Sequence, residues 1–299
     1  MSIKNNDMCR KIVILLIAFS LYAVIISACA GGNVVIDMPV VSDYESEAIV
    51  EIKNIWVGVV SGPYGDMFKE AILPGLEKMG YTATFIYYTD YSSPNFALDR
   101  NEIDINIFQH YAYLIDFKFE NDLALTAIME IPTVSMGIFS NRINSIDELK
   151  NESTVSIPDD ASNLARALRV LESSGVIKLD PFIDKSKATL SDILSNPLNI
   201  RIIPTGAHDL VAFLDLCDIS VINGNYAVSG GLNLLDALYQ EVLVDNYVNV
   251  IAVRTEDLNK QFVRDIINVI YSDEFRRIIT DPTGNYAGFQ WPRWFHEAG

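Results

Sequence analysis

The sequence predicts an α/β protein built from two doubly wound lobes that are joined by crossing strands. Short apolar runs rich in β-branched residues alternate with segments of helical length, and this alternation is typical of βαβ units. Two such series follow each other without a proline- or serine-rich linker between them. Roughly 250 residues remain after the N-terminal region, which is enough for two modest lobes.

The first series starts with the apolar run 55–60, which we expect to be a strand. A Gly/Pro turn leads into an amphipathic helix over 66–79 that stops at Gly80. Two more strands are expected at 83–87 and 103–107. Their near-continuous apolarity is typical of a parallel sheet that is covered on both faces.

The second series follows the segment 136–140. Ser145 and Glu148 form a capping box that should open a short helix there. In open α/β sheets ligands bind beyond the carboxyl ends of the strands, so a two-lobed chain should bind its ligand between the lobes. We expect the hinges between the lobes near 137–140 and 246–250. The remaining expected elements are strands at 154–157, 200–203, 219–222 and 248–253, and helices at 208–215, 260–271 and 273–279.

These patterns divide the chain into five parts. The C-terminal part ends in an aromatic tail, which either packs against a lobe or forms an exposed contact for a partner. The expected parts are a lipoprotein signal peptide (1–28), a flexible tether (29–50), the first part of lobe 1 (51–137), lobe 2 (138–248), and the return to lobe 1 with the C-terminal helices and tail (249–299).

The N-terminus has the features of a bacterial lipoprotein signal. Basic residues precede the apolar run 12–26, and small residues lead up to Cys29. Small residues admit the signal peptidase, and the thiol of Cys29 accepts diacylglycerol. The run is shorter than the roughly 18 to 20 residues that span a bilayer. We therefore expect a protein anchored through lipid on Cys29 at the extracytoplasmic face of the cell membrane.

Charge and composition exclude several classes of function. The net charge is −17 and the chain is acidic overall, which disfavours nucleic-acid binding and a strongly anionic ligand. Without Cys9 and Cys29, Cys217 has no partner for a disulfide in the folded part, and its apolar surroundings indicate a small core residue.

Neither metal nor catalysis is indicated by the motifs. The three histidines lie too far apart for a local metal motif, so we expect no metal and no cofactor. The chain has no G-x-S-x-G elbow and no H-E-x-x-H motif. We therefore assign no catalytic residues, and a membrane-anchored hydrolase is the disfavoured alternative.

Eight segments together, by their order and spacing, point to a known family. They are 57–63, 88–95, 108–114, 135–140, 157–160, 166–168, 221–227 and 247–251, among them Phe-Gln-His-Tyr-Ala-Tyr-Leu at 108–114 and Val-Ile-Asn-Gly-Asn-Tyr-Ala at 221–227. In these segments the chain resembles the methionine-binding lipoproteins of ABC importers, the NlpA lipoprotein family. The resemblance covers nearly the whole chain after the signal and implies a fold like that of type II periplasmic binding proteins.

The resemblance also implies a ligand, partners and a site. The ligand would be an amino acid, with methionine the leading candidate, and the partners would be ABC permease subunits and, through Cys29, membrane lipid. Aromatic residues would hold the ligand side chain, while an arginine and asparagines would hold its charged end. The implied ligand-binding residues are Tyr91, Phe108, His110, Tyr113, Arg166, Asn223, Asn225 and Asn249.

The residue chemistry is compatible with these roles but leaves alternatives open. Arg166 lies near the start of a predicted helix, where its guanidinium and the positive helix end suit a carboxylate; it could instead be solvated or paired with Asp159 or Asp160. The asparagines could serve turns, the aromatic residues could be core residues, and the buried amide of Asn249 needs either ligand or backbone as its partner. His110 is expected to hydrogen-bond rather than to bind metal.

Two positions depart from the family pattern. Ala112 stands where a proline usually precedes the tyrosine, and Ala165 stands where a glycine usually precedes the arginine. Both lie in ligand-bearing turns, with the methyl of Ala165 expected beside the carboxylate site. The alternative ligands are therefore another small amino acid or a methionine-containing dipeptide. A surface sensor or adhesin that keeps the binding fold without transport is a separate alternative.

Overall fold

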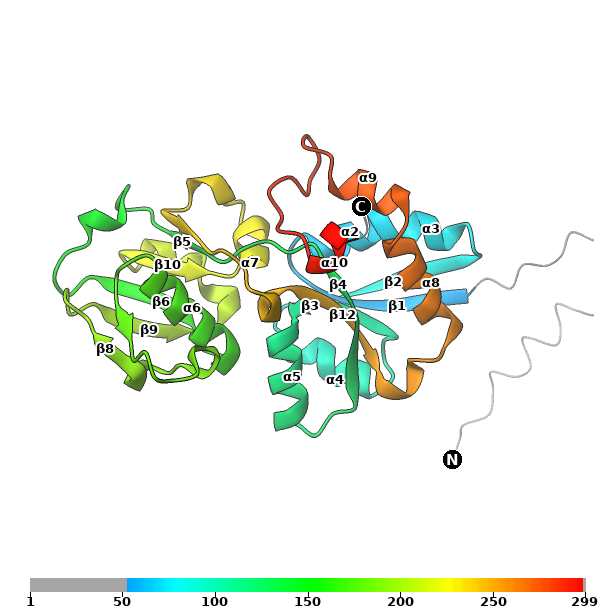
Figure 1. Ribbon diagram of the computed structural model, residues 1–299, viewed down its shortest axis with the longest axis horizontal. Coiled ribbons are helices and arrows are strands. Elements are labelled where there is room, and N and C mark those ends of the chain that lie inside the picture. The colour runs from blue at the N-terminus through cyan, green and yellow to red at the C-terminus, as the bar shows by residue number, and fades with distance from the viewer. Residues whose placement is uncertain (1–52, 298–299) are drawn as a thin grey trace, which may run out of the picture. The chain divides into compact units, whose positions relative to one another are not determined.

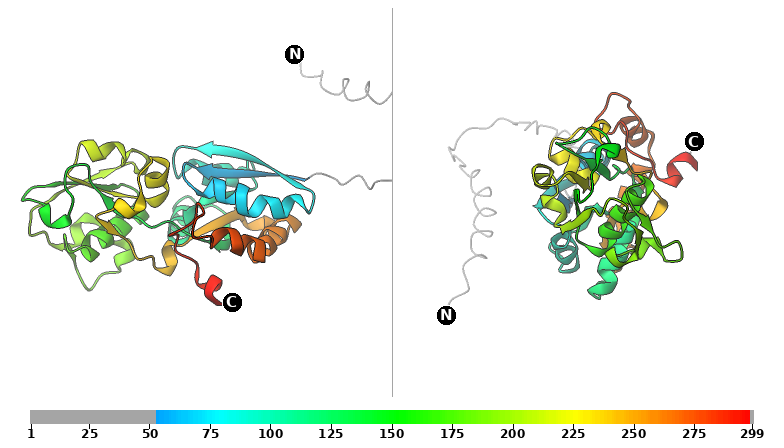
Figure 2. Two further views of the ribbon diagram at one scale, coloured as in Figure 1. Left: turned by 90° about the horizontal axis from the view of Figure 1, so that it is seen from above. Right: turned by 90° about the vertical axis from the view of Figure 1, so that its left-hand side faces the viewer.

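The computed structural model describes residues 53–297, which are arranged in two lobes (Figures 1 and 2). Each lobe is built around a five-stranded sheet. The first sheet has the strand order β2-β1-β3-β12-β4, and the second has the order β11-β5-β10-β6-β9. The two sheets with helices around them agree with the predicted two-lobed α/β architecture.

The first sheet combines the early strands with one strand from near the C-terminus. The early strands β1 and β3 run parallel, as expected, but β12 is antiparallel to both of its neighbours. The parallel arrangement expected for the early strands is therefore confirmed for β1, β2 and β3, whereas β12 runs antiparallel because it enters from the second lobe. The strands are β1 (Lys53–Val60), β2 (Tyr81–Tyr88), β3 (Ile105–His110), β4 (Leu125–Ile131) and β12 (Asn249–Arg254).

Alternation along β12 shows how this sheet is covered on both faces. Ile251 and Val253 belong to one apolar core, whereas Val250 and Ala252 belong to another on the opposite face, as the two-residue period of a strand requires. One face carries α2 (Tyr64–Met67), α3 (Leu73–Glu77), α8 (Gln261–Ile270) and α9 (Asp273–Ile279), and the other carries α4 (Ser93–Asp99) and α5 (Tyr111–Glu120) (Figure 1).

The helix expected over 66–79 is interrupted. A π-helical segment, Phe68–Ile72, separates α2 from α3. Pro74 follows this segment; it has no N–H to donate, and its ring would clash with the carbonyl of Glu70 in a regular α-helix. The wider turn avoids that clash. Gly80, at a φ of +85°, ends the helical region as predicted.

The second lobe is organised around its central strands and the long helix α6 (Ala161–Ser173). The helix expected at 208–215 is wrong: two 3-10 turns, Ala207–Asp209 and Ala212–Asp215, take its place. They are closed by tight backbone bonds such as Leu214 N to Val211 O. The other elements are β5 (Gly137–Phe139), β6 (Thr154–Pro158), β9 (Arg201–Thr205), β10 (Ile219–Ile222), β11 (Tyr239–Gln240), α7 (Gly224–Ser229) and a small separate pair, β7 (Lys178–Leu179) and β8 (Ile193–Ser195).

Two segments connect the sheets, 132–136 between β4 and β5 and 241–248 between β11 and β12. Of the two expected hinges, 137–140 is mostly β5, and 246–250 spans the end of the second connecting segment and the start of β12. The predicted residue boundaries of the lobes stay predictions. We use the term crossing segments for 132–136 and 241–248.

The aromatic tail packs against the first lobe. Tyr286, Phe289 and Phe295 are buried in the core that faces α8 and α9, and the tail ends in α10 (Arg293–Glu297). Of the two alternatives for this tail, the structure therefore favours packing.

Gln290, within the tail, is bonded to both crossing segments. Its backbone pairs with Thr133 in a β-bridge. Its side-chain amide donates to Ser135 Oγ (2.5 Å) and to the carbonyl of Glu241 (3.0 Å), and its Oε1 accepts from the backbone N–H of Leu243 (3.0 Å). One side chain thus holds the two segments together at the lobe junction.

Replacing Gln290 with alanine is expected to lower the free energy of unfolding by about 1 to 3 kcal/mol, since part-buried groups on both crossing segments lose their partner. Urea unfolding of the full chain measures the change. Gln261→Ala is the matched control, because Gln261 is exposed on α8 and bonds only within its own helical region. Equal stability of the two variants would contradict a bracing role for Gln290.

Candidate functional site

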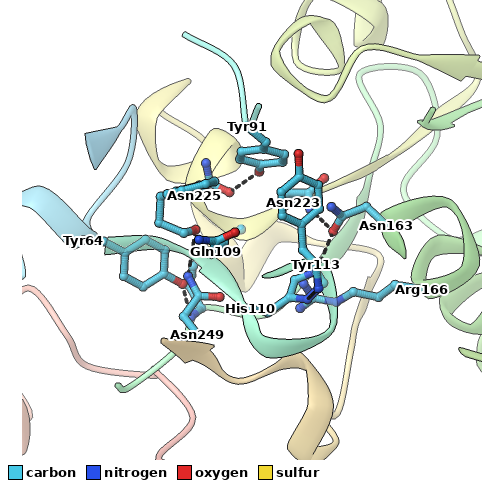
Figure 3. A pocket seen from close by; sticks show the side chains of 13 residues that line it. Tyr64, Tyr91, Gln109, His110, Tyr113, Asn163, Arg166, Asn223, Asn225 and Asn249 are labelled. Carbon is cyan, nitrogen blue, oxygen red and sulfur yellow. Dashed lines mark hydrogen bonds between the residues drawn. The ribbon is translucent and has the colours of Figure 1, made fainter. Parts of the chain in front are cut away.

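One cavity at the lobe junction brings together every ligand-binding residue predicted from the sequence (Figure 3). Its volume is about 20 Å³, which is room for about one water molecule. The cavity is therefore narrow, with the lining side chains close to one another. It is lined by Tyr91, Phe108, His110, Tyr113, Arg166, Asn223, Asn225 and Asn249, and also by Tyr64, Gln109, Val134, Asn163 and Gly224.

His110 is fixed by the junction of β3 and α5. It is the N-cap of α5, and its Nδ1 accepts a hydrogen bond from the backbone N–H of Tyr113 (3.0 Å). The proton of the neutral ring must then be on Nε2, which donates to Oδ1 of Asn163 on the second lobe (3.1 Å). Both ring nitrogens are therefore engaged within the protein, and one of these bonds links the lobes.

Asn163 connects several parts of the site. Besides His110, its Oδ1 accepts from Nδ2 of Asn223 (2.7 Å). Its own amide donates to Asp160, the N-cap of α6, at 3.0 and 3.1 Å. The sequence analysis missed Asn163, although it lies three residues before Arg166 and so shares a face of the same helix.

Arg166 pairs with a residue that the sequence analysis did not consider. Its Nε lies 2.9 and 3.0 Å from the carboxylate oxygens of Glu241, and its Nη2 lies 2.5 Å from Oε2. Both side chains are buried. Neither Asp159 nor Asp160 is the partner. The pair uses Nε and Nη2, which leaves the N–H groups of Nη1 for a further acceptor.

The aromatic residues form a slot on the other side of the cavity. Tyr91 stacks on Phe108 with ring centroids 5.8 Å apart, and the edge of Tyr113 meets Tyr91 at 5.7 Å. Tyr226, which the sequence analysis did not single out, packs 5.1 Å from Tyr91 and donates to the carbonyl of Thr89 (3.0 Å). The slot is therefore made from both lobes.

The three predicted asparagines differ in how fully they are satisfied. Asn225 accepts from the hydroxyl of Tyr91 (2.7 Å) and donates to the carbonyl of Ser61 (3.0 Å), so it joins the lobes. Asn249 donates to the carbonyl of Phe108 (3.0 Å), which makes backbone its partner. Oδ1 of Asn223 is buried and has no hydrogen-bond partner among the described residues, so it is free to accept from a ligand.

Comparison with known proteins places this fold and site in a family. The sequence model of the NlpA lipoprotein family matches residues 55–294. The chain belongs to the NlpA lipoprotein family. The resemblance inferred from the sequence motifs is thereby confirmed.

Two named relatives and one solved structure show what this NlpA-family protein is similar to. The outer membrane lipoprotein 3 of Mannheimia haemolytica is 34% identical over 74% of this chain and 84% of that protein. The D-methionine-binding lipoprotein MetQ of Salmonella typhi is 33% identical over 74% of this chain and 82% of that protein. A solved nutrient binding protein from Burkholderia cenocepacia, bound to methionine, has a TM-score of 0.72 at 32% identity, with 76% of this chain and 95% of that chain covered. The predicted fold class is confirmed.

The departures from the family pattern have a local explanation in the NlpA-family protein. Ala112 lies in the first turn of α5, where backbone N–H groups have no partner within the helix. Ala165 is fully buried in the core of the second lobe and does not line the cavity. The expectation that its methyl lies beside the carboxylate site is therefore wrong, because consecutive helical residues point about 100° apart and Ala165 turns towards the core of the second lobe.

The structure also bears on the predictions for Cys217, for metal binding and for the N-terminal region. Cys217 is buried and unpaired. Within residues 53–297 no group of three or more acidic, cysteine or histidine residues is arranged to hold a metal ion, and no helix in that range has the length and apolarity to cross a bilayer. The lipidation of Cys29, the signal 1–28 and the tether 29–50 lie outside the described residues.

Burial keeps His110 and the tyrosines of the NlpA-family site neutral near pH 7. Burial, and then the nearby charge of Arg166, lower the pKa of His110 to about 3. Burial raises the pKa of Tyr64 to about 12 and raises those of Tyr91 and Tyr113 as well. Burial raises the pKa of the Asp160 carboxyl to about 6, against the opposing hydrogen bonds from Asn163.

The low pKa of His110 predicts a pH-dependent effect on stability. In the unfolded chain the imidazole binds a proton below its ordinary pKa of 6.5, whereas the folded chain excludes that proton down to about pH 3. The free energy of unfolding therefore decreases as the pH falls below 6.5, by up to about 1.4 kcal/mol per pH unit, because His110 binds a proton only in the unfolded chain.

His110→Asn removes this contribution, so the wild type should lose stability relative to the variant between pH 7 and pH 5. Urea unfolding at both values measures the difference. Asp160 has the opposite pH dependence but is common to both proteins and cancels in the comparison. His208→Asn, at a half-exposed histidine, is the control. A wild-type minus variant difference that does not change with pH would contradict a buried neutral His110.

Proposed function

We propose that this chain is the substrate-binding protein of an ABC importer, anchored by lipid on Cys29 at the extracytoplasmic face of the cell membrane. It captures an amino acid, with methionine the leading candidate, between its two lobes and delivers it to the permease. The names of its relatives support a binding role, since they include methionine-binding lipoproteins and a methionine-bound nutrient binding protein.

The observation that carries this proposal is the arrangement of unused polar groups beside an aromatic slot. Arg166 has Nη1 available for a carboxylate, and Asn223 has a buried oxygen available for an ammonium group. An α-amino acid has both groups on one carbon. The rings of Tyr91, Phe108 and Tyr113 suit the thioether of methionine.

Typical binding free energies indicate how much the apolar and the polar parts of the site contribute. Full burial of a methionine side chain contributes about 1.5 to 3 kcal/mol, and sulfur on aromatic edges adds about 0.3 to 1.5 kcal/mol. Micromolar to nanomolar affinity requires about 8 to 12 kcal/mol in total. The polar groups must therefore supply much of the binding free energy.

Closure of the two lobes is stabilised by hydrogen bonds that form only when the lobes are in contact. His110 to Asn163, Tyr91 to Asn225 and Asn225 to Ser61 all join one lobe to the other. The cavity is too narrow for an amino acid as it stands, so the lobes must part to admit the ligand. A ligand that contacts both lobes then shifts the population back towards the closed form. The crossing segments are the proposed hinge.

Hydrolysis is the weaker candidate. His110 is a neutral ring whose two nitrogens are held by Tyr113 and Asn163, so it is not poised as a general base. Cys217 is buried outside the cavity lining. The sensor or adhesin role uses the same pocket, and an uptake assay separates it from import: loss of methionine uptake on deletion of the gene supports import, and unchanged uptake supports the other role.

The binding proposal is tested by calorimetry on the full chain in detergent, after unfolding and refolding to remove carried-over ligand. Binding of L- or D-methionine with micromolar or tighter affinity is the expected result. A preference for a methionine-containing dipeptide or another amino acid would keep the binding role and change the substrate. Failure to bind any amino acid or peptide would contradict the proposal.

The anchor has its own test. Cys29→Ala removes the thiol that accepts lipid, so the protein should leave the membrane fraction while keeping its affinity for ligand. Cys217→Ala is the matched control and should stay in the membrane fraction. Membrane retention of the Cys29 variant would contradict lipid anchoring at this residue.

A further inference from the structure

Glu241 pairs with Arg166 at the edge of the proposed ligand site but does not line the cavity. It begins the second crossing segment, directly after β11, and its side chain is buried. Its carboxylate accepts hydrogen bonds from Arg166, and Oε2 also accepts from the backbone N–H of Met136 on the first crossing segment (3.1 Å). The carboxylate is therefore fixed from two directions and cannot easily turn away from Arg166.

The pairing sets the charge of the pocket before any ligand arrives. Burial opposes ionisation of Arg166, but the adjacent charge of Glu241 raises the pKa of its guanidinium, which stays charged. A buried charge without a partner is strongly unfavourable. Because Glu241 supplies that partner, Arg166 offers hydrogen-bond donors while the pair carries no net charge.

Two other charged groups lie near this pair. Arg169 lies one turn further along α6, stacks on the ring of Tyr247 at 5.1 Å and lines a separate pocket together with Glu241. Asp160 caps α6 and bonds Asn163. Neither of these lines the cavity, so Arg166 is the cavity-lining cation and Glu241 is its counter-ion.

The charge balance distinguishes between classes of ligand. A zwitterionic amino acid adds no net charge when it enters, and its ammonium group can donate to Oδ1 of Asn223. A carboxylate without the amino group adds a full negative charge close to Glu241 and leaves Asn223 unpaired. Like charges in a buried site are unfavourable.

We propose that Glu241 is a specificity-determining residue: by balancing Arg166, it makes the pocket select zwitterionic amino acids over carboxylates that lack the α-amino group. This inference rests on the proposed amino-acid binding function and adds the reason for its selectivity. Without Glu241, the lone charge of Arg166 favours an anionic ligand. Glu241 thus acts through Arg166 and does not itself need to touch the ligand.

The test compares two ligands that differ only in the amino group, methionine and 4-(methylthio)butanoate. Calorimetry on the full chain gives the ratio of their affinities for the wild type and for Glu241→Gln. We expect the wild type to prefer methionine and the variant to reduce that preference by at least about tenfold, mainly through tighter binding of the carboxylate-only ligand. A loss of affinity for both ligands in equal proportion would overturn the proposal.

Two further variants separate charge from folding. Glu241→Asp keeps the negative charge on a shorter side chain, so it should retain the wild-type ratio within about threefold, whatever its absolute affinities; a collapsed ratio would overturn the charge explanation, even if the glutamine variant fails to fold. Glu256→Gln removes a negative charge from an exposed side chain and should leave the ratio unchanged.

These outcomes distinguish the inference from the function on which it rests. A wild type that binds neither ligand would contradict the proposed function and remove the basis of the inference. A wild type that binds methionine, together with a Glu241→Gln variant of unchanged preference, would overturn the inference alone.

Discussion

Arg166→Ala is expected to weaken methionine binding by roughly a hundredfold or more. The variant loses the N–H groups of Nη1, which the proposed site offers to the ligand carboxylate, and truncation of one partner in a buried charged pair typically costs about 2 to 5 kcal/mol of binding free energy. The side chain is almost fully buried beside Glu241 and the ring of Tyr247, so water cannot readily replace it. Calorimetry with methionine measures the change.

The same substitution leaves Glu241 buried without its cation, which should lower the free energy of unfolding by about 3 to 5 kcal/mol. The double variant Arg166→Met with Glu241→Gln removes both charges and should recover much of that stability without recovering affinity. Arg169→Ala is the matched control: Arg169 lies one turn further along α6 on the same tyrosine ring but does not line the cavity. Undiminished binding in Arg166→Ala would contradict the site assignment.

Gly62→Ala is expected to weaken ligand binding by about ten- to a hundredfold by opposing closure. Gly62 follows β1 and has a φ of +136°, a conformation that costs other residues about 1 to 3 kcal/mol. A Cβ at this position would also lie 2.6 Å from Cβ of Asn225 and 3.0 Å from its carbonyl oxygen. Asn225 follows the second sheet and bonds Tyr91 and Ser61, so the clash acts on the contacts that hold the lobes together.

Gly288→Ala separates backbone strain from this clash. Gly288 also has a positive φ, of +85°, but a Cβ there would meet no atom within 4 Å. Both variants should lose stability in urea unfolding, and only Gly62→Ala should lose affinity in calorimetry and remain more expanded with ligand in small-angle scattering. Equal affinities for the two variants would show that the contact between Gly62 and Asn225 does not contribute to closure.

The sequence by itself determined the features that depend on local pattern or on family motifs. Alternating apolar and helical segments identified most strands and the helices α8 and α9, because the burial of an element follows a period that its own residues set. The resemblance selected eight residues that line one cavity. Lipid anchoring at Cys29 stays a prediction from the sequence, since Cys29 lies outside the described residues.

Only the tertiary structure decided the partners of those residues. Arg166 meets Glu241 from 75 positions later, His110 meets Asn163 across the lobe junction, and Gln290 returns from the tail to hold both crossing segments. Such pairs depend on how the chain crosses between lobes, and no local period records them. A local pattern can show that a polar side chain is buried, but the fold determines which distant group satisfies it and therefore what charge the pocket presents to a ligand.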